Sequence, residues 1–203
     1  MSKVLVLYYS AFGYVAVVAR SIADGARSAG ASVDIKRVAD EASRAAPDRG
    51  MLFNAGKSVP VATVEDLVNY DAIIVGSPTR FGRLSAPVAG FLEQAGELAS
   101  RGALHGKVGG AFASPTSPDG GQEAASMSIL TNLLYFGMVV VGPPYSATTV
   151  ADSAGQRHPS PQDLDGARRL GRLIAQTAQK LSGGADPGAA DIEEEAESAA
   201  APP

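Results

Sequence analysis

The hydrophobic residues of this chain alternate between two spacings. Lys3–Tyr9 is a near-continuous apolar run, which is typical of a strand buried on both faces of a parallel sheet. The next segment, Val15–Ala29, repeats apolar residues at helical spacing and ends at Gly30. Because strand and helix patterns keep alternating as far as Leu181, the chain is predicted to form a doubly wound α/β sandwich.

The same two spacings place the remaining elements. Further strands are expected at Ser32–Val38, Ala72–Gly76, Lys107–Ser114 and Met138–Gly142. Further helices are expected near Val64–Val68, from Pro87 to Ser100, and at Gln122–Phe136 and Asp163–Leu181. Two stretches rich in helix breakers, Ala39–Pro60 and Pro143–Pro161, are expected to be mainly loop.

Charge separates the folded domain from a C-terminal tail. The whole chain has 21 acidic and 17 basic residues, a formal charge of −4. Residues 183–203 hold six of the acids and no base, which leaves 15 acidic against 17 basic residues, or +2, in residues 1–182. The tail is otherwise mostly Ala, Gly, Pro and Ser and cannot bury enough surface to offset its ordering entropy. We therefore predict one domain over 1–182 and a disordered tail over 183–203, either a solvated appendage or an interaction tail.

Composition excludes several kinds of chemistry. The chain has no Cys and two His, so disulfides, thiolate metal sites and cysteine nucleophiles are excluded and no metal site is expected. No apolar run approaches the roughly 20 residues of a spanning helix, and no signal-peptide pattern begins the chain. We expect a cytoplasmic protein with neither membrane nor nucleic-acid partners.

Three loops follow the first, third and fourth predicted strands, at Ser10–Tyr14, Ser77–Ser85 and Ser114–Gly121. Sheets of this class bind ligands beyond the carboxyl ends of their strands, where the strand order changes direction. The first loop offers backbone N–H groups at a helix start, the Ser10 hydroxyl and a flexible Gly13, which suits a phosphate; a plain helix cap is the alternative.

The second and third loops suit a ligand with a flat aromatic ring. Arg80 and Phe81 place a cation and an aromatic ring at a strand end, while Gly120 and Gly121 allow close approach to a ligand. The first loop has neither the Lys of a triphosphate-binding loop nor the G-x-G-x-x-G of a dinucleotide fingerprint. Together the loops predict a phosphorylated aromatic ligand with the shape of FMN.

Five segments resemble the WrbA family of flavodoxin-like FMN proteins, typically NAD(P)H:quinone oxidoreductases and often tetrameric. The segments are KVLVLYYSAFGY (3–14), YDAIIVGSPTRFG (70–82), FLEQAGEL (91–98), GGQE (120–123) and GMVVVG (137–142). The resemblance runs from about Lys3 to Leu181. It implies a three-layer sandwich around a five-stranded parallel sheet in the order 2-1-3-4-5, FMN as cofactor, NADH or NADPH as donor, a quinone as substrate, and a homodimer or homotetramer.

The resemblance also implies a set of cofactor-binding residues. The first loop would hold the phosphate, the second would lie along the flavin and the third at its pyrimidine side, with Phe12 and Tyr135 at the mouth of the pocket. The set is Ser10, Ala11, Phe12, Gly13, Tyr14, Val15, Pro78, Thr79, Arg80, Phe81, Gly82, Ser114, Pro115, Thr116, Ser117, Gly120, Gly121 and Tyr135.

Departures from the family pattern leave other functions open. Tyr14 and Tyr135 stand where the family has His, Ala99 stands where it has Trp, and two prolines in the third loop lack an N–H. His105 and His158 match no family His and are expected to lie at the surface. We therefore assign no side-chain acid or base. A non-catalytic flavin-binding or multimeric interaction protein is the main alternative, and a one-electron flavodoxin shuttle fits the +2 domain less well.

Overall fold

A single parallel sheet forms the centre of the molecule. The computed structural model describes residues 1–39, 58–115, 120–142, 149–150 and 158–183. The five strands are β1 (Lys3–Tyr8), β2 (Ser32–Arg37), β3 (Ala72–Pro78), β4 (Val108–Ser114) and β5 (Val139–Val140). They pair in the order β2-β1-β3-β4-β5, all parallel, which confirms the predicted fold and strand order.

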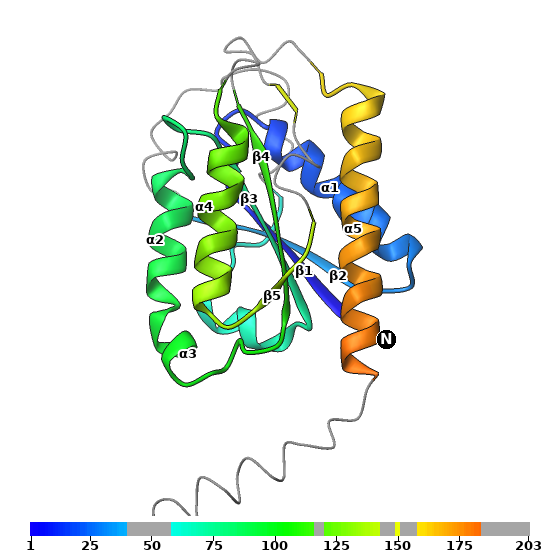
Figure 1. The fold of residues 1–203 in the computed structure, drawn as a ribbon. Helices are drawn as coiled ribbons and strands as arrows, with labels where there is room; N and C mark the ends of the chain where they lie inside the picture. Colours follow the sequence, from blue (N-terminus) through cyan, green and yellow to red (C-terminus); the bar gives the residue numbers. More distant parts are fainter. Residues whose placement is uncertain (40–57, 116–119, 143–148, 151–157, 184–203) are drawn as a thin grey trace, which may run out of the picture.

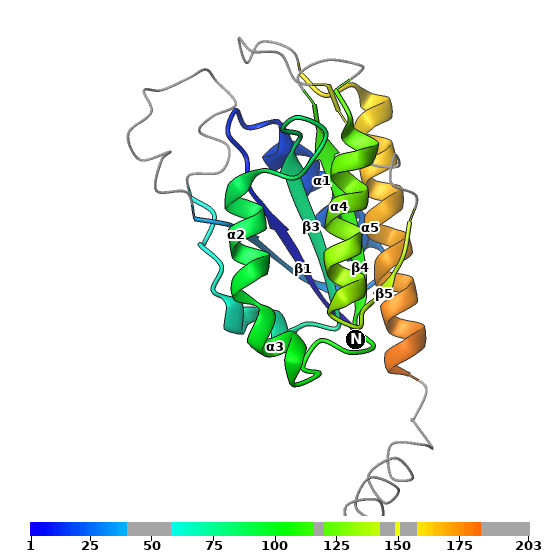
Figure 2. The same cartoon turned by 60° about the vertical axis from the view of Figure 1, so that its left-hand side comes forward.

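Helices cover both faces of this sheet (Figures 1 and 2). One face carries α1 (Tyr14–Ser28) and α5 (Pro161–Ser182). The other carries α2 (Ala86–Gln94), α3 (Gly96–Ser100) and α4 (Gln122–Tyr135), and a 3₁₀ helix, η3 (Val64–Asn69), leads into β3. None of the helices in the part of the chain that the structure describes is long and apolar enough to cross a membrane.

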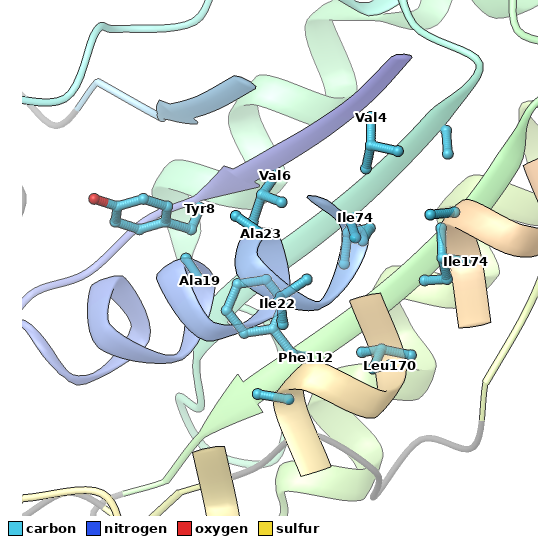
Figure 3. Packing of buried hydrophobic residues seen from close by; sticks show 14 of the residues in the cluster. Val4, Val6, Tyr8, Ala19, Ile22, Ala23, Ile74, Phe112, Leu170 and Ile174 are labelled. Atoms are coloured by element: carbon cyan, nitrogen blue, oxygen red, sulfur yellow. The ribbon is translucent and has the colours of Figure 1, made fainter. Parts of the chain in front are cut away.

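The apolar run of β1 is buried on both sides because successive side chains of a strand point to opposite faces. Val4, Val6 and Tyr8 pack under α1 and α5, whereas Leu5 and Leu7 pack under α2 and α4. Figure 3 shows the first of these clusters, where strand residues meet α1 and α5. The sequence run therefore serves two cores at once.

A glycine in β3 makes room for a large aromatic side chain of that cluster, Phe112. Gly76 pairs with Phe112 of β4, and a Cβ at Gly76 would overlap the phenyl ring. The ring thus lies across the neighbouring strand and remains 1% exposed. β3 and β4 remain paired as far as their carboxyl ends, where the second and third loops begin.

Two elements differ from their predicted extents. The helix expected from Pro87 to Ser100 is divided at Ala95 into α2 and α3, and Gly96, a weak helix former, follows the break. The fifth strand pairs over two residues instead of five, at the edge of the sheet. The predicted tail beyond Gly183, and residues 40–57 of the predicted excursion, lie outside the described residues.

Candidate functional site

The three predicted loops meet at one small pocket. Its lining comes from all three: Ser10, Ala11, Phe12, Tyr14 and Val15 from the first, Pro78, Thr79 and Arg80 from the second, and Ser114 from the third. Parallel pairing explains the meeting, since Tyr8 stands opposite Gly76 and Pro78 opposite Ser114 at the same edge of the sheet. The space inside is about 10 Å³, room for a single water, so a phosphate can enter only if the loops move apart.

In the first loop, two backbone donors converge on one oxygen atom. The N–H groups of Gly13 and Ala16 both donate to Ser10 Oγ, at 3.0 Å and 3.4 Å. Gly13 adopts a φ of 90°, which turns the chain sharply into α1. The N-cap of α1 is Gly13, and the Ser10 hydroxyl accepts from N–H groups at the start of the helix. The same donors can serve a phosphate oxygen, so the two predicted roles share one donor set.

Thr79 lines the pocket and carries a buried hydroxyl group. Its backbone N–H donates to the carbonyl of Ser114 at 3.1 Å, which joins the second loop to the end of β4. Its Oγ1 is buried and has no hydrogen-bond partner among the described residues. A buried hydroxyl without a partner costs about 1–3 kcal/mol. The described residues that line the pocket include one cation and no acid, and together with this hydroxyl they fit a polar anionic ligand such as FMN.

The base of the second loop is closed by two buried serines that the sequence analysis did not single out. Ser85 N–H donates to Ser77 Oγ at 2.8 Å, and the two hydroxyls lie 3.0 Å apart. Both residues are at most 2% exposed. These bonds hold the start and end of the loop together and fix the tip that lies between them.

That tip is a tight turn with an exposed aromatic ring. Phe81 has a φ of 52°, and its side chain is 99% exposed. A positive φ is uncommon for a bulky residue and strains the backbone. The adjacent Gly82 packs against Gly121 at the start of α4, where a Cβ would lie 3.0 Å from the Gly82 Cα. The second and third loops therefore touch through two glycines.

Ser114, from the third loop, is fully engaged within the protein. Its hydroxyl donates to the carbonyl of Thr149 at 2.7 Å, and the Thr149 hydroxyl in turn donates to Asp163 of α5 at 2.9 Å. Pro115 is buried and Gly120 is partly buried, whereas Thr116 and Ser117 lie outside the described residues. Ser114 therefore frames the pocket, and its hydroxyl is already used.

One predicted site residue lies far from the others. Gln122 starts α4 beside the loops, but Tyr135 ends this helix 13 residues later, about 20 Å away at helical rise. Within one chain, Tyr135 therefore lies away from the pocket that Phe12 lines. His105 packs against Gly137 next to that same end of α4, and both His105 and His158 are exposed, in agreement with their predicted surface positions.

Comparison with known proteins identifies the family. Residues 2–152 match the family model described as NADPH-dependent FMN reductase. The chain belongs to this family. The "NAD(P)H dehydrogenase (quinone)" of Acidovorax ebreus (strain TPSY) is 54% identical over 201 residues, 91% of this chain and 100% of that relative. The protein of the same name from Cupriavidus metallidurans is 54% identical over 200 residues, 90% of this chain and all of the relative.

Solved structures place this FMN reductase family member among flavodoxin-like folds. A WrbA-like flavodoxin from Agrobacterium tumefaciens superimposes with a TM-score of 0.67 at 21% identity, covering 89% of this chain and 99% of that one. A flavodoxin from the domain Archaea gives 0.64 at 24% identity, with 87% and 99% covered. At these identities the likeness establishes the fold, and it agrees with the family resemblance drawn from the motifs.

Proposed function

We propose that this FMN reductase family member is an FMN-dependent NAD(P)H dehydrogenase that reduces quinones. The observation that carries the proposal is the meeting of three loops, at the carboxyl edge of the sheet, around a pocket with amide donors and an unsatisfied hydroxyl. The quinone dehydrogenases that are 54% identical over nine-tenths of the chain support the same activity. The pocket thus supports the cofactor, and the relatives support the reaction.

Named residues would hold the cofactor. The N–H groups of Gly13 and Ala16, which donate to Ser10 Oγ, would donate to the FMN phosphate. Thr79 Oγ1, which has no hydrogen-bond partner among the described residues, would bond the cofactor. The chemistry supplied by FMN when bound is acceptance of hydride from a nicotinamide and donation of two electrons to a quinone. The chain itself supplies amides, a cation at Arg80 and the exposed Phe81 ring beside the site.

The test is a titration followed by an assay. Purified protein is titrated with FMN while flavin absorbance and fluorescence are followed, and the loaded protein then oxidises NADH or NADPH with benzoquinone as acceptor. We expect stoichiometric binding and turnover with parallel double-reciprocal lines. FMN binding without turnover contradicts the dehydrogenase proposal and supports the non-catalytic flavin protein. Failure to bind FMN contradicts both.

We also propose that the protein is a homo-oligomer in which Tyr135 serves a neighbouring copy. Met127, Leu134 and Tyr135 lie on one face of α4 at helical spacing and are 48%, 54% and 86% exposed. Apolar faces of this kind mark association surfaces, and Tyr135 cannot reach the loops of its own chain. Light scattering with L134E tests this: we expect wild type to be larger than one chain and L134E to dissociate. A monomeric wild type contradicts it.

The location we propose is the cytoplasm, because that compartment holds the NADH and NADPH pools the reaction draws on. The absence of Cys is compatible with it. Fractionation of producing cells tests the proposal, and recovery of the protein with the membranes or outside the cell contradicts it.

A further inference from the structure

Arg80 and Arg83 face each other across the turn at the tip of the second loop. Arg80 N–H donates to the Arg83 carbonyl at 2.9 Å, and Arg83 N–H donates back at 3.1 Å. Phe81 and Gly82 between them have φ values of 52° and 72°, as a type I′ turn requires. Residues that exchange two such bonds stand directly opposite, about 5.5 Å apart at Cα, with side chains on the same face.

This turn is held in place from two sides. Leu84 N–H donates to Ser128 Oγ of α4 at 3.3 Å, and Gly82 packs against Gly121. The backbone positions of both arginines relative to the pocket are therefore set by β3 and α4. A turn whose backbone is already fixed loses less conformational entropy when a ligand binds between the two side chains.

No acidic side chain in the described part of the chain forms an ion pair with Arg80 or Arg83. Both arginines are exposed, and neither side chain has an ion-pair or hydrogen-bond partner there. Glu123, the acid in the first turn of α4, accepts a hydrogen bond from Gln122 instead. Like charges directly opposite each other destabilise a hairpin, so this pair does not serve stability. Two planar guanidinium groups carried by opposite residues of one turn suit a dianionic phosphate.

We propose that Arg80 and Arg83 together bind the 2′-phosphate of NADPH and make NADPH the preferred electron donor. This inference rests on the proposed function, because it assigns a donor to that reaction. The 2′-phosphate is the only group that distinguishes NADPH from NADH, so a pair of arginines that binds it sets the choice between them.

The FMN phosphate is a poorer candidate for this pair. Its donors lie in the first loop, at the start of α1, and Arg83 does not line that pocket. Arg80 does line it, so the pair extends from the pocket wall outward along the exposed side of the turn. Both arginines are exposed, so a second nucleotide approaching the site from solvent can reach them.

Calorimetry and kinetics on FMN-loaded protein test the proposal. The probes are adenosine 2′,5′-bisphosphate and adenosine 5′-monophosphate, which differ only in the 2′-phosphate. We expect wild type to bind the bisphosphate roughly tenfold more tightly, R83Q to lose most of that difference, and R83K, which lacks the planar fork, to fall between. R101Q is the matched control, since Arg101 is exposed in the turn after α3 and lies outside the loops.

Kinetics then separate the two proposals. We expect kcat/KM to favour NADPH over NADH by about tenfold in wild type and R101Q, and R83Q to raise KM for NADPH while leaving NADH within about twofold. Equal binding of the two probes by wild type, or an equal effect of R83Q on both donors, overturns the arginine proposal and leaves the dehydrogenase intact. Selective bisphosphate binding without turnover does the reverse. Circular dichroism checks that each variant is folded.

Discussion

The carbonyl of Ile22 in α1 lies against the Cα of Gly171 in α5, so closely that a Cβ at Gly171 would overlap its oxygen. A second glycine, Gly25 of α1, meets the Arg168 carbonyl of α5 in the same way. The two helices therefore cross with their backbones in contact. This crossing holds α5 on the sheet and, through the Asp163–Thr149–Ser114 hydrogen bonds, the end of β4 at the candidate site.

We expect G171A to lower the free energy of unfolding by about 2–4 kcal/mol, because the added methyl group forces two backbones apart. Urea denaturation measures the change. G90A is the matched control: Gly90 lies in α2 with nothing within 4 Å of an added Cβ, so Ala should stabilise by about 0.5–1 kcal/mol. Equal effects of the two substitutions would contradict the crossing.

T79V should have opposite effects on the apo protein and on FMN binding. Removing a buried hydroxyl that has no partner in the described part of the chain should raise apo stability by up to about 1 kcal/mol. If that hydroxyl bonds the cofactor, the same change weakens FMN binding about fivefold to tenfold. Thermal unfolding and fluorescence titration measure the two effects.

S126A is the control for T79V. Ser126 Oγ is also buried without a partner among the described residues, but it lies within α4 and does not line the pocket. We expect S126A to stabilise similarly and to leave FMN affinity unchanged. A loss of FMN affinity in both variants would show that Thr79 has no special role.

Substitution of Asp66 should change how stability depends on pH. Partial burial alone would raise the pKa of Asp66. Two hydrogen bonds, from Lys36 Nζ at 2.6 Å and from Thr63 N–H, act together with the positive charge of Lys36, outweigh this effect and hold the pKa below its usual value. The ionised carboxylate therefore stabilises the fold above the ordinary Asp pKa of about 3.9, and this contribution is lost as pH falls through the lower folded value.

We expect D66N to cost about 1 kcal/mol at pH 7 and almost nothing near pH 2. Denaturant midpoints of both proteins across this range measure the difference. D24N is the control, because Asp24 pairs with Arg27 in an exposed position, 65% and 48% accessible, and should change stability by less than about 0.5 kcal/mol. A D66N deficit that persists unchanged at pH 2 would rule out the carboxylate as its cause.

F81N should stabilise the apo protein and weaken its site. Asn tolerates positive φ better than Phe, and the Phe81 ring is exposed and buries little surface, so relief of strain should add about 0.5–1 kcal/mol. If the ring lies along the flavin, FMN affinity falls at the same time. Unchanged affinity in a stabilised F81N would remove Phe81 from the site.

Much of the fold could be predicted because burial repeats locally. The apolar run of β1 and the helical spacing of α1 and α5 are visible in neighbouring residues, and their bounds were confirmed to within two residues at either end. The break at Ala95 and the short extent of β5 were not predicted. Whether a helix continues or a strand pairs at these positions depends on what packs against the segment, which overrides local propensity.

The sequence by itself determined the alternation of strands and helices and the three loops at the carboxyl ends of the strands, because parallel strands bring these ends to one edge whatever their side chains are. The order of the strands was implied by the family resemblance, and the structure confirms it. Only the tertiary structure decided which atoms meet there. The unsatisfied Thr79 hydroxyl, the opposition of Arg80 and Arg83 and the distance of Tyr135 depend on turn geometry and on contacts between residues far apart in the chain. No local pattern of hydrophobic and polar residues encodes such contacts.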